Sequence, residues 1–254
     1  MKIATWNVNS LKVRLPQVLD WLVGNRPDAL CLQELKLEDE AFPEAEIRAA
    51  GYHAVFAGQK AYNGVAILAA APPEDVARGI PDFADEQQRL IAATVGGLRI
   101  VCGYFPNGQE PGSDKFAYKL AWLGALTRWL GEEALPEHPR LALAGDFNIA
   151  PAEADAHPDW QEEIHVSPPE RAAFQALLAC GLVDAFRLFE QSERSYTCWD
   201  YRQGAFRRNV GLRIDHILVS RPLQSVCRAC RVDKTPRALA RPSDHAPVVL
   251  ELDV

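Results

Sequence analysis

The stretch LALAGDFN, residues 141–148, decides the fold. Its apolar run predicts a buried strand over residues 140–144, and the acid and amide that follow are expected where that strand leaves the core. Residues two apart on a strand face the same side, so Asp146 and Asn148 are expected to project together while Phe147 faces the opposite layer. Gly145 has no side chain and is expected to let a ligand approach the backbone closely.

Three other stretches repeat this arrangement, in which polar side chains follow an apolar run. They are Leu32-Gln33-Glu34, Arg213-Ile214-Asp215 and Ser243-Asp244-His245. Asn7 and Asn9, at the end of the first predicted strand, share one face by the same parity. Singly, each stretch has an ordinary explanation, because Asp, Asn and Gly form turns and a lone histidine is seldom catalytic. Jointly, the carboxylates, amides and imidazole suggest a metal-dependent phosphodiesterase whose site is assembled only by folding.

Strands and helices alternate along the chain. Strands are predicted over residues 2–8, 29–33, 52–56, 65–70, 140–144, 214–220, 226–232 and 248–252, and helices over 15–23, 114–130 and 169–180. Pro16 is expected in the first turn of the first helix. Residues 90–95 and 98–104 flank Gly96-Gly97, which suits the two-residue turn of a hairpin. Residues 151–168 are predicted to be a loop. No linker or repeat is evident, so a single domain over residues 1–254 is expected.

The composition indicates a soluble protein. Hydrophobic residues make up 48% of the 254 residues, and no run approaches the roughly 18–20 apolar residues of a membrane span. The N-terminal sequence is strand-like and shows no export signal, so the cytoplasm is the expected compartment. Four of the six cysteines lie inside apolar runs, which argues against a disulfide framework. Cys227 and Cys230 form a lone C-x-x-C, and both are expected to be packed thiols and not zinc ligands.

The net charge of −7 hides an uneven distribution. Residues 185–245 contain twelve Lys or Arg and six Asp or Glu, a net charge of +6, so the rest of the chain carries −13. Affinity for nucleic acid depends on local neutralisation of phosphates, so an acidic protein with one basic face can still bind DNA. A solvated charged surface is an equally good interpretation of this stretch.

Six motifs, in order along the chain, resemble those of exonuclease III and the related abasic-site endonucleases. They are Trp6-Asn7-Val8-Asn9, Leu32-Gln33-Glu34, Gly103-Tyr104-Phe105-Pro106, Gly145-Asp146-Phe147-Asn148, Gly211-Leu212-Arg213-Ile214-Asp215 and Ser243-Asp244-His245-Ala246-Pro247. The resemblance extends over about residues 2–251. It implies a deoxyribonuclease I-like α/β fold, a four-layer sandwich in which two mixed β-sheets pack face to face. Helices would cover both outer sides, and the site would lie at one end.

The same resemblance implies a metal site. Asn7 and Glu34 would hold Mg²⁺ or Mn²⁺, with Asp146, Asn148 and Asp244 lining the same pocket. Hard oxygen ligands suit Mg²⁺, and a cluster without cysteine disfavours zinc.

The resemblance also assigns the reacting groups. Asp146 is expected to orient and deprotonate the attacking water, and Asn148 to steady that water or a phosphate oxygen. His245 would contact the phosphate while Asp215 fixes and charges its ring. Tyr104 would contact the phosphate or the leaving group. Whether Asp146 or the pair of His245 and Asp215 is the base stays open.

Residues that contact DNA are implied as well. They are Asn107, Lys119, Cys198, Trp199 and Leu212. Cys198 stands where relatives often have an aromatic residue. Leu212 stands where some abasic-site enzymes have tryptophan, and leucine at this position resembles the exonuclease III branch. Arg207 and Arg208 are candidate phosphate contacts. For these arginines, and for Asn107 and Lys119, a plain solvated surface is nearly as good an interpretation.

The implied function is metal-dependent DNA repair. The enzyme would remove nucleotides 3′ to 5′ from duplex DNA and would incise 5′ to abasic sites, acting as a monomer on duplexes with abasic sites, nicks or blocked 3′ ends. One alternative is a catalytically inactive regulator that binds nucleic acid on the same scaffold. Another is a phosphatase or sphingomyelinase acting on lipid head groups, although no membrane-binding amphipathic stretch is evident.

Overall fold

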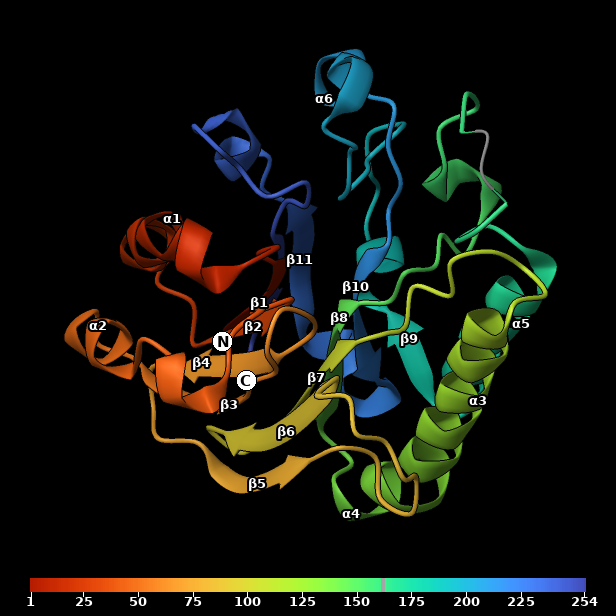
Figure 1. Ribbon diagram of the computed structural model, residues 1–254. Helices are drawn as coiled ribbons and strands as arrows, with labels where there is room; N and C mark the ends of the chain where they lie inside the picture. Colours follow the sequence, from red (N-terminus) through yellow and green to blue (C-terminus); the bar gives the residue numbers. More distant parts are fainter. Residues whose placement is uncertain (161–162) are drawn as a thin grey trace.

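Two six-stranded sheets pack face to face in the computed structural model, which describes residues 1–160 and 163–254 (Figure 1). The first sheet has the order β11-β12-β1-β2-β4-β3 and the second β5-β6-β7-β8-β10-β9. The strands of the first sheet are β1 (Lys2–Asn7), β2 (Ala29–Gln33), β3 (His53–Ala57), β4 (Val65–Ala69), β11 (Cys227–Val232) and β12 (Val248–Leu252). Those of the second are β5 (Glu74–Arg78), β6 (Leu90–Val95), β7 (Leu98–Tyr104), β8 (Leu141–Asp146), β9 (Leu182–Asp184) and β10 (Asp215–Ser220). Both sheets are mixed, because β1 and β2 run parallel, as do β7 and β8.

Helices cover the outer face of each sheet (Figure 1). On the first sheet lie α1 (Leu11–Asn25) and α2 (Glu44–Ala49), and on the second α3 (Asp114–Trp129) and α5 (Pro168–Ala179). A π-helical segment, Leu130–Ala134, joins α3 to the short α4 (Leu135–Glu137). The four layers confirm the predicted sandwich. The short α6 (Ala205–Arg208) stands apart, on a loop that projects beyond the edge of the sheets.

The core between the sheets changes from apolar to polar along the strands. On β1, Ile3 belongs to the apolar core, while Thr5 and Asn7, which share its parity, are buried polar residues. Gln33, at the end of β2, donates from Nε2 to Thr5 Oγ1 over 3.0 Å and to Cys102 Sγ of the second sheet over 3.3 Å. Buried polar groups are costly unless they are paired. The buried polar residues at this end of the sandwich therefore indicate a functional site and not a packed core.

Most predicted elements are confirmed, and the differences have local causes. The first helix begins at Leu11, so Pro16 lies in its second turn and not in its first. Proline has no N–H to donate to the carbonyl of Lys12, and both residues are exposed to solvent. Sequence patterns do not predict α2, β5 or β9. The first has six residues and β9 three, and β5 is an exposed edge strand without an apolar face.

Gly145 has a different purpose from the one expected. It pairs with Gly103 on the parallel neighbour strand. A Cβ at Gly145 would lie 1.9 Å from the carbonyl oxygen of Gly103. Glycine is therefore required for the approach of two backbones of the protein itself, and not for a ligand.

Two further observations limit other interpretations. Among residues 1–160 and 163–254, no helix has the length and apolar character to cross a bilayer. The predicted loop over residues 151–168 is described except at residues 161 and 162, which lie outside the described part of the chain. Within that part it contains the short 3₁₀ turn Glu153–Asp155.

Candidate active site

Three predicted site residues form one row across the second sheet. Tyr104 is the register partner of Asp146 in the parallel pair of β7 and β8, and Asp215 is its partner in the antiparallel pair of β8 and β10. All three side chains face the first sheet, because they share parity with core residues such as Ala144 and Ile217. Regular strand pairing alone thus brings together residues that are far apart in the sequence.

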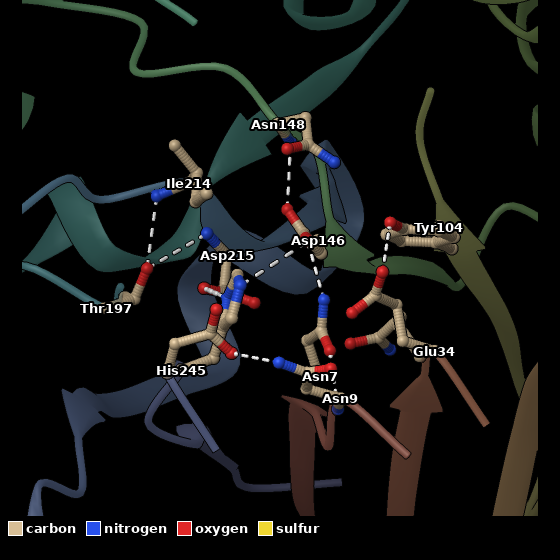
Figure 2. A network of polar contacts seen from close by, with 12 residues as sticks. Asn7, Asn9, Glu34, Tyr104, Asp146, Asn148, Thr197, Ile214, Asp215 and His245 are labelled. Atoms are coloured by element: carbon tan, nitrogen blue, oxygen red, sulfur yellow. Dashed lines mark hydrogen bonds and ion pairs between the residues drawn. The ribbon is translucent and has the colours of Figure 1, made fainter. Parts of the chain in front are cut away.

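The first sheet contributes Asn7 from the end of β1. Its Nδ2 donates to Asp146 Oδ2 over 2.9 Å, and both side chains are buried. The backbone N–H of Asn148 donates to the other oxygen, Oδ1, also over 2.9 Å. Each oxygen of Asp146 therefore has a fixed donor, which orients the carboxylate (Figure 2).

His245 enters from the segment before β12. Its Nδ1 is 2.8 Å from Asp215 Oδ2, and its Nε2 is 3.8 Å from Asp146 Oδ2. Since Asp215 takes Nδ1, the ring presents Nε2 to Asp146 (Figure 2). Among the described residues, Asp215 Oδ1 is buried without a hydrogen-bond partner. The site thus places two buried carboxylates around a single imidazole.

These contacts shift the pKa values of the buried groups. Burial, with a further contribution from the charge of Asp215, raises the pKa of Asp146 to about 7, although His245 and hydrogen bonds from Asn7 and Asn148 act against it. Burial alone would lower the pKa of His245, but the carboxylates of Asp215 and Asp146 raise it well above its usual value. At neutral pH the imidazole is therefore charged, and Asp146 is near its point of half-ionisation.

Glu34 and Tyr104 form the other side of the site (Figure 2). The Tyr104 hydroxyl donates to Glu34 Oε1 over 2.5 Å. Burial and the charges of Glu34 and Asp146 raise the pKa of Tyr104 well above its usual value, so the phenol keeps its proton. Lys36 Nζ lies 3.5 Å from Glu34 Oε2 and donates to Asn9 Oδ1 over 2.6 Å.

Asn9 connects this side of the site to Asp244. Its Nδ2 donates to Asp244 Oδ1 over 3.0 Å, and its backbone N–H donates to Asn7 Oδ1 over 2.9 Å. Glu34, Asp146, Asp244 and His245 therefore belong to one connected network.

The strand ends turn sharply at the site. Asn9, Glu34 and Asn148 all have left-handed backbone conformations, with φ of 42°, 56° and 51°. Asn tolerates this conformation better than most residues, whereas Glu rarely adopts it. Asn148 does not continue the strand as the two-residue parity predicts. It reverses the chain, and its Nδ2 donates to the carbonyl of Phe105 over 3.0 Å.

Three residues expected to contact DNA are buried. Lys119 has no exposed side-chain surface and pairs with Glu170, and its Nζ donates to the carbonyls of Asn107 and Asn148 over 3.0 and 2.7 Å. Lys119 therefore has no exposed surface for the direct DNA contact that the resemblance implies, and it supports the loops behind the site.

Trp199 and Leu212 are 0% and 1% exposed. The Nε1 of Trp199 donates to Asn209 Oδ1 over 3.0 Å, inside the base of the loop that carries α6. In the described part of the chain, both side chains are therefore packed inside this segment and present almost no surface for the wall of the sugar pocket that the resemblance implies.

The remaining predicted contacts are accessible. Asn107 is exposed and lines a cleft of about 540 Å³ beside Glu34 and Tyr104, which also includes Arg89 and Lys115. Arg207 and Arg208 are exposed on α6. Cys198 is half-buried. Its thiol, a nitrogen of His245 and a carboxylate oxygen of Asp244 lie within 4.8 Å of one another, so the cluster is not free of cysteine as the sequence suggests.

A second set of buried ion pairs lies behind the site. Arg213 donates from Nε to Asp155 Oδ1 over 2.6 Å and from Nη2 to Asp184 Oδ2 over 2.8 Å. Arg187 also pairs with Asp155. Arg213, Asp155 and Asp184, with the pair of Lys119 and Glu170, are called the scaffold cluster below. Asp146, Asp215 and His245 are called the site cluster.

Sequence reasoning missed two positioning residues. Thr197 Oγ1 accepts from the backbone N–H groups of Ile214 and Asp215, each over 3.1 Å. Ser243 Oγ donates to the carbonyl of Asn7 over 2.7 Å and accepts from the N–H of His245 over 3.2 Å. Ser243 belongs to the motif Ser243-Asp244-His245, which was a usable signal, whereas Thr197 had none.

The donor set fits a hard divalent cation. The side chains of Asn7, Glu34 and Asp146 lie around the polar end of the sandwich (Figure 2), and Oδ1 of Asp215 nearby is buried without a hydrogen-bond partner among the described residues. Carboxylate and amide oxygens are the ligands that Mg²⁺ and Mn²⁺ prefer.

Comparison with known proteins places the chain. Residues 4–245 match the Endonuclease/Exonuclease/phosphatase family. Exodeoxyribonuclease III of Haemophilus influenzae is 37% identical over 266 residues, which cover 99% of each chain. A solved Neisseria protein, described as the 3′ phosphatase NExo bound to a product DNA hairpin, is 50% identical with a TM-score of 0.97 and full coverage of both chains. An AP endonuclease from Archaeoglobus fulgidus is 41% identical with a TM-score of 0.95, again over both full chains.

The chain therefore belongs to the endonuclease/exonuclease/phosphatase family. Within it, the full-length similarity to exodeoxyribonuclease III and to an AP endonuclease confirms the resemblance seen in the six motifs. The observed sandwich agrees with the same assignment.

Proposed function

We propose that this protein is a Mg²⁺-dependent DNA repair nuclease that removes nucleotides from 3′ ends of duplex DNA and incises 5′ to abasic sites. The single observation that carries the proposal is the polar connection across the ends of both sheets, in which hydrogen bonds join Asn7 to Asp146 and His245 to Asp215, and a 3.8 Å ion pair joins His245 to Asp146. The relatives are named for exonuclease, 3′-phosphatase and AP endonuclease activities, which all hydrolyse phosphate esters of DNA.

Asp146 is the base in this proposal. Its raised pKa, about 7, is close to a neutral operating pH, where a carboxylate best combines availability with basicity. It takes a proton from the attacking water as the water oxygen bonds to phosphorus and the bond to the departing sugar oxygen breaks. Asn7 and the N–H of Asn148 hold the carboxylate in position for that transfer.

His245 serves as the phosphate contact and not as the base. With Asp215 on Nδ1, its charged ring directs Nε2–H toward the space next to Asp146, where it can donate to a phosphoryl oxygen. Tyr104 keeps its proton and is placed to donate to the phosphate or to the leaving oxygen.

Asn7 and Glu34 would hold Mg²⁺, with Asp146, Asn148 and Asp244 bordering the same space. When bound, the ion supplies charge neutralisation at the phosphoryl oxygens. One chain contributes every residue of this site, which supports a monomer, and the continuous core between the sheets supports one domain over residues 1–254.

Duplex DNA fits the surroundings of the site. The cleft beside Glu34 contains Asn107, Arg89 and Lys115, and Arg207 and Arg208 project on α6. Exposed cations on both sides of a carboxylate site can neutralise the phosphates that flank the cut. The alternative of an inactive regulator has no support. The relatives of this chain are named as enzymes, and the chain has all of the proposed reacting groups.

The test uses labelled duplexes with one abasic site, a recessed 3′ end or a 3′-phosphate. We expect Mg²⁺-dependent incision 5′ to the lesion and removal of nucleotides or phosphate from the 3′ end, all abolished by a chelator. Tight binding without cleavage would contradict the proposal and favour the regulator.

Glu34→Ala tests the metal assignment. The loss of a carboxylate ligand is expected to lower turnover by about 100-fold or more and to raise the Mg²⁺ concentration needed for half-maximal activity. Glu38→Ala, which removes an exposed acid four residues away, is the matched control and should leave both values unchanged. An unchanged Mg²⁺ requirement in Glu34→Ala would refute the assignment.

A further inference from the structure

The backbone fixes Cys198 directly opposite His245. The two residues form an isolated antiparallel bridge. The N–H of Trp199 donates to the carbonyl of Asp244 over 3.0 Å, and the N–H of Ala246 to the carbonyl of Thr197 over 2.7 Å. These bonds flank the pair and do not join it, so Cys198 and His245 are a non-hydrogen-bonded pair, whose side chains lie on one face at their closest spacing.

The three side chains here are a soft-metal donor set. One ligand atom each from Cys198, Asp244 and His245 lies within 4.8 Å of the others. Because Asp215 occupies Nδ1 of His245, Nε2 is the nitrogen left to bind. In the described part of the chain, the hydrogen bonds to the Asp244 carboxylate all reach Oδ1, which leaves Oδ2 for another partner.

We propose that Cys198, Asp244 and His245 form a binding site for a soft divalent cation such as Zn²⁺, and that its occupancy inhibits the nuclease. The inhibition rests on the function proposed above, whereas the binding does not. The site is distinct in chemistry from the oxygen site of Asn7 and Glu34. Thiolate and imidazole select Zn²⁺ over Mg²⁺, so a large excess of Mg²⁺ does not compete for it.

The geometry requires only a small closure. Zn–S and Zn–N bonds of about 2.3 and 2.0 Å in a tetrahedron place ligand atoms roughly 3.3–3.8 Å apart. The present spacing of up to 4.8 Å exceeds this by about 1.5 Å at most, which rotation of the half-buried Cys198 and Asp244 side chains can supply. On binding, the thiol S–H bond and the Nε2–H bond of the charged His245 ring both break, the two protons pass to solvent, and the sulfur and Nε2 bond to the metal.

The surroundings of His245 already resemble the outer shell of a zinc site. A carboxylate on the far nitrogen of a ligating histidine fixes the tautomer and raises the basicity of the metal-binding nitrogen. Asp215 does this at 2.8 Å. Asp146 Oδ2, 3.8 Å from Nε2, or a water molecule can complete four-coordination.

The proposed inhibition follows from binding of the metal to Nε2 of His245. A metal on Nε2 withdraws that atom from the phosphate, and a ligand role for Asp244 disturbs its hydrogen bond with Asn9. The bound ion also fills the space between His245 and the half-exposed Cys198. Both effects lower turnover even when Mg²⁺ is saturating.

Binding is tested on the purified protein without DNA, using Co²⁺ as a coloured probe for zinc. We expect a thiolate-to-cobalt charge-transfer band that Zn²⁺ abolishes, and at least about 100-fold weaker binding in Cys198→Ser, since loss of a ligand exceeds the 10–100-fold cost of an outer-shell change. Cys180→Ser, at another half-buried thiol, is the matched control and should bind as the wild type does. Absence of the band, or its survival in Cys198→Ser, would overturn the site.

Cys227→Ser separates this site from the C-x-x-C pair, whose two thiols are buried. Loss of the band in Cys227→Ser with retention in Cys198→Ser would assign the metal to that pair and refute the proposal.

Inhibition is then measured as the ratio of Mg²⁺-supported rates with and without Zn²⁺ for each variant. This ratio should fall steeply with Zn²⁺ in the wild type. In Cys198→Ser, the Zn²⁺ concentration that halves the ratio should be at least about 100-fold higher. Equal zinc sensitivity in both would overturn the inhibitory role. Failure of the nuclease function itself would appear separately, as absence of cleavage with Mg²⁺ alone while the cobalt band persists.

Discussion

The site cluster and the scaffold cluster are both buried and charged, yet they differ in how completely their charges are paired. In the scaffold cluster, Arg213 satisfies both Asp155 and Asp184, and Lys119 satisfies Glu170. In the site cluster, two carboxylates share one imidazole, and an oxygen of Asp215 has no hydrogen-bond partner among the described residues. Burial of charge therefore does not identify function by itself. The cluster that is left incompletely satisfied is the one to which the reaction is assigned.

The pKa directions express the same difference. The site cluster raises the pKa of Asp146 to about 7, so this buried acid is easily protonated. Next to the scaffold cluster, burial and the charge of Arg213 lower the pKa of His216 to about 3, so this histidine stays neutral. Substitutions in the two clusters should consequently affect different properties of the protein.

The largest effect is expected from Asp146→Asn in the site cluster. Turnover should fall by about 10²–10⁴-fold, because the amide cannot accept the proton of the attacking water. Stability should stay within about 1 kcal/mol, since the variant removes a buried charge that faces Asp215. Steady-state kinetics and denaturant unfolding of the same preparation give both numbers. Near-normal turnover in a folded variant would contradict the assigned role.

Lys119→Met makes the opposite change in the scaffold cluster. It leaves Glu170 buried without its cation and should lower the free energy of unfolding by about 3–5 kcal/mol. The salt dependence of DNA binding should not change, because the amine is inaccessible. Lys115→Met, four residues earlier and exposed, is the matched control and should leave stability unchanged. A weaker dependence of DNA affinity on salt in Lys119→Met would show that the Lys119 amine contacts a DNA phosphate, contrary to its burial in this structure.

Acid should weaken the scaffold side by an intermediate amount. Burial lowers the pKa of His165 to about 4 and that of His216 to about 3, whereas the unfolded chain titrates near 6.5. At each of these two histidines the unfolded state therefore binds more protons below about pH 6.5, so each should remove about 2 kcal/mol of stability between pH 7.5 and pH 5, while proton uptake by Asp146, whose pKa is raised to about 7 in the folded state, acts in the opposite direction. His216 Nδ1 accepts from Arg213 Nη1 over 2.9 Å, a bond that protonation would break.

Denaturant unfolding at the two pH values measures this loss. His216→Gln should reduce the difference between them, and His53→Gln, at an exposed position, should not. Equal differences in wild type and His216→Gln would show that this histidine does not set the acid limit.

The smallest effect is expected at the edge of the site cluster. Cys198→Trp enlarges a half-buried side chain opposite His245 and should change the ratio of abasic incision to 3′ removal by about 10-fold at most. Parallel assays on an abasic duplex and a recessed 3′ end give this ratio. If it does not change, Cys198 lies outside the part of the site that touches the sugar.

The sequence predicts the fold where hydrophobic pattern and turn chemistry agree. The hairpin of β6 and β7 and the strand β2 have their predicted bounds, because each is a mostly apolar run and Gly96-Gly97 marks the turn between β6 and β7. β5 escapes prediction, because an exposed edge strand buries no regular face.

The candidate residues that the structure brings together are those next to apolar runs in the sequence, whereas burial of a polar side chain is harder to predict. Asp146 and Asp215 each adjoin such a run, and they are register partners in the structure. Lys119 was mistaken for a surface cation, although it lies on the apolar face of α3 between Phe116 and Trp122, a spacing that already indicated burial. The opposition of Cys198 and His245 depends on an isolated bridge between two irregular segments, and no local pattern reports such pairing.

The pairing of β1 with β12 has a consequence for how the enzyme is made. The strand that ends in Asn7 is completed by the strand that follows His245, so the first and last strands of the sheet are neighbours. A growing polypeptide on the ribosome cannot close this sheet until its final segment has emerged. An unfinished nuclease should therefore be harmless to the genome, and a chain cut short before Val248 is expected to show no cleavage of DNA at any concentration of Mg²⁺.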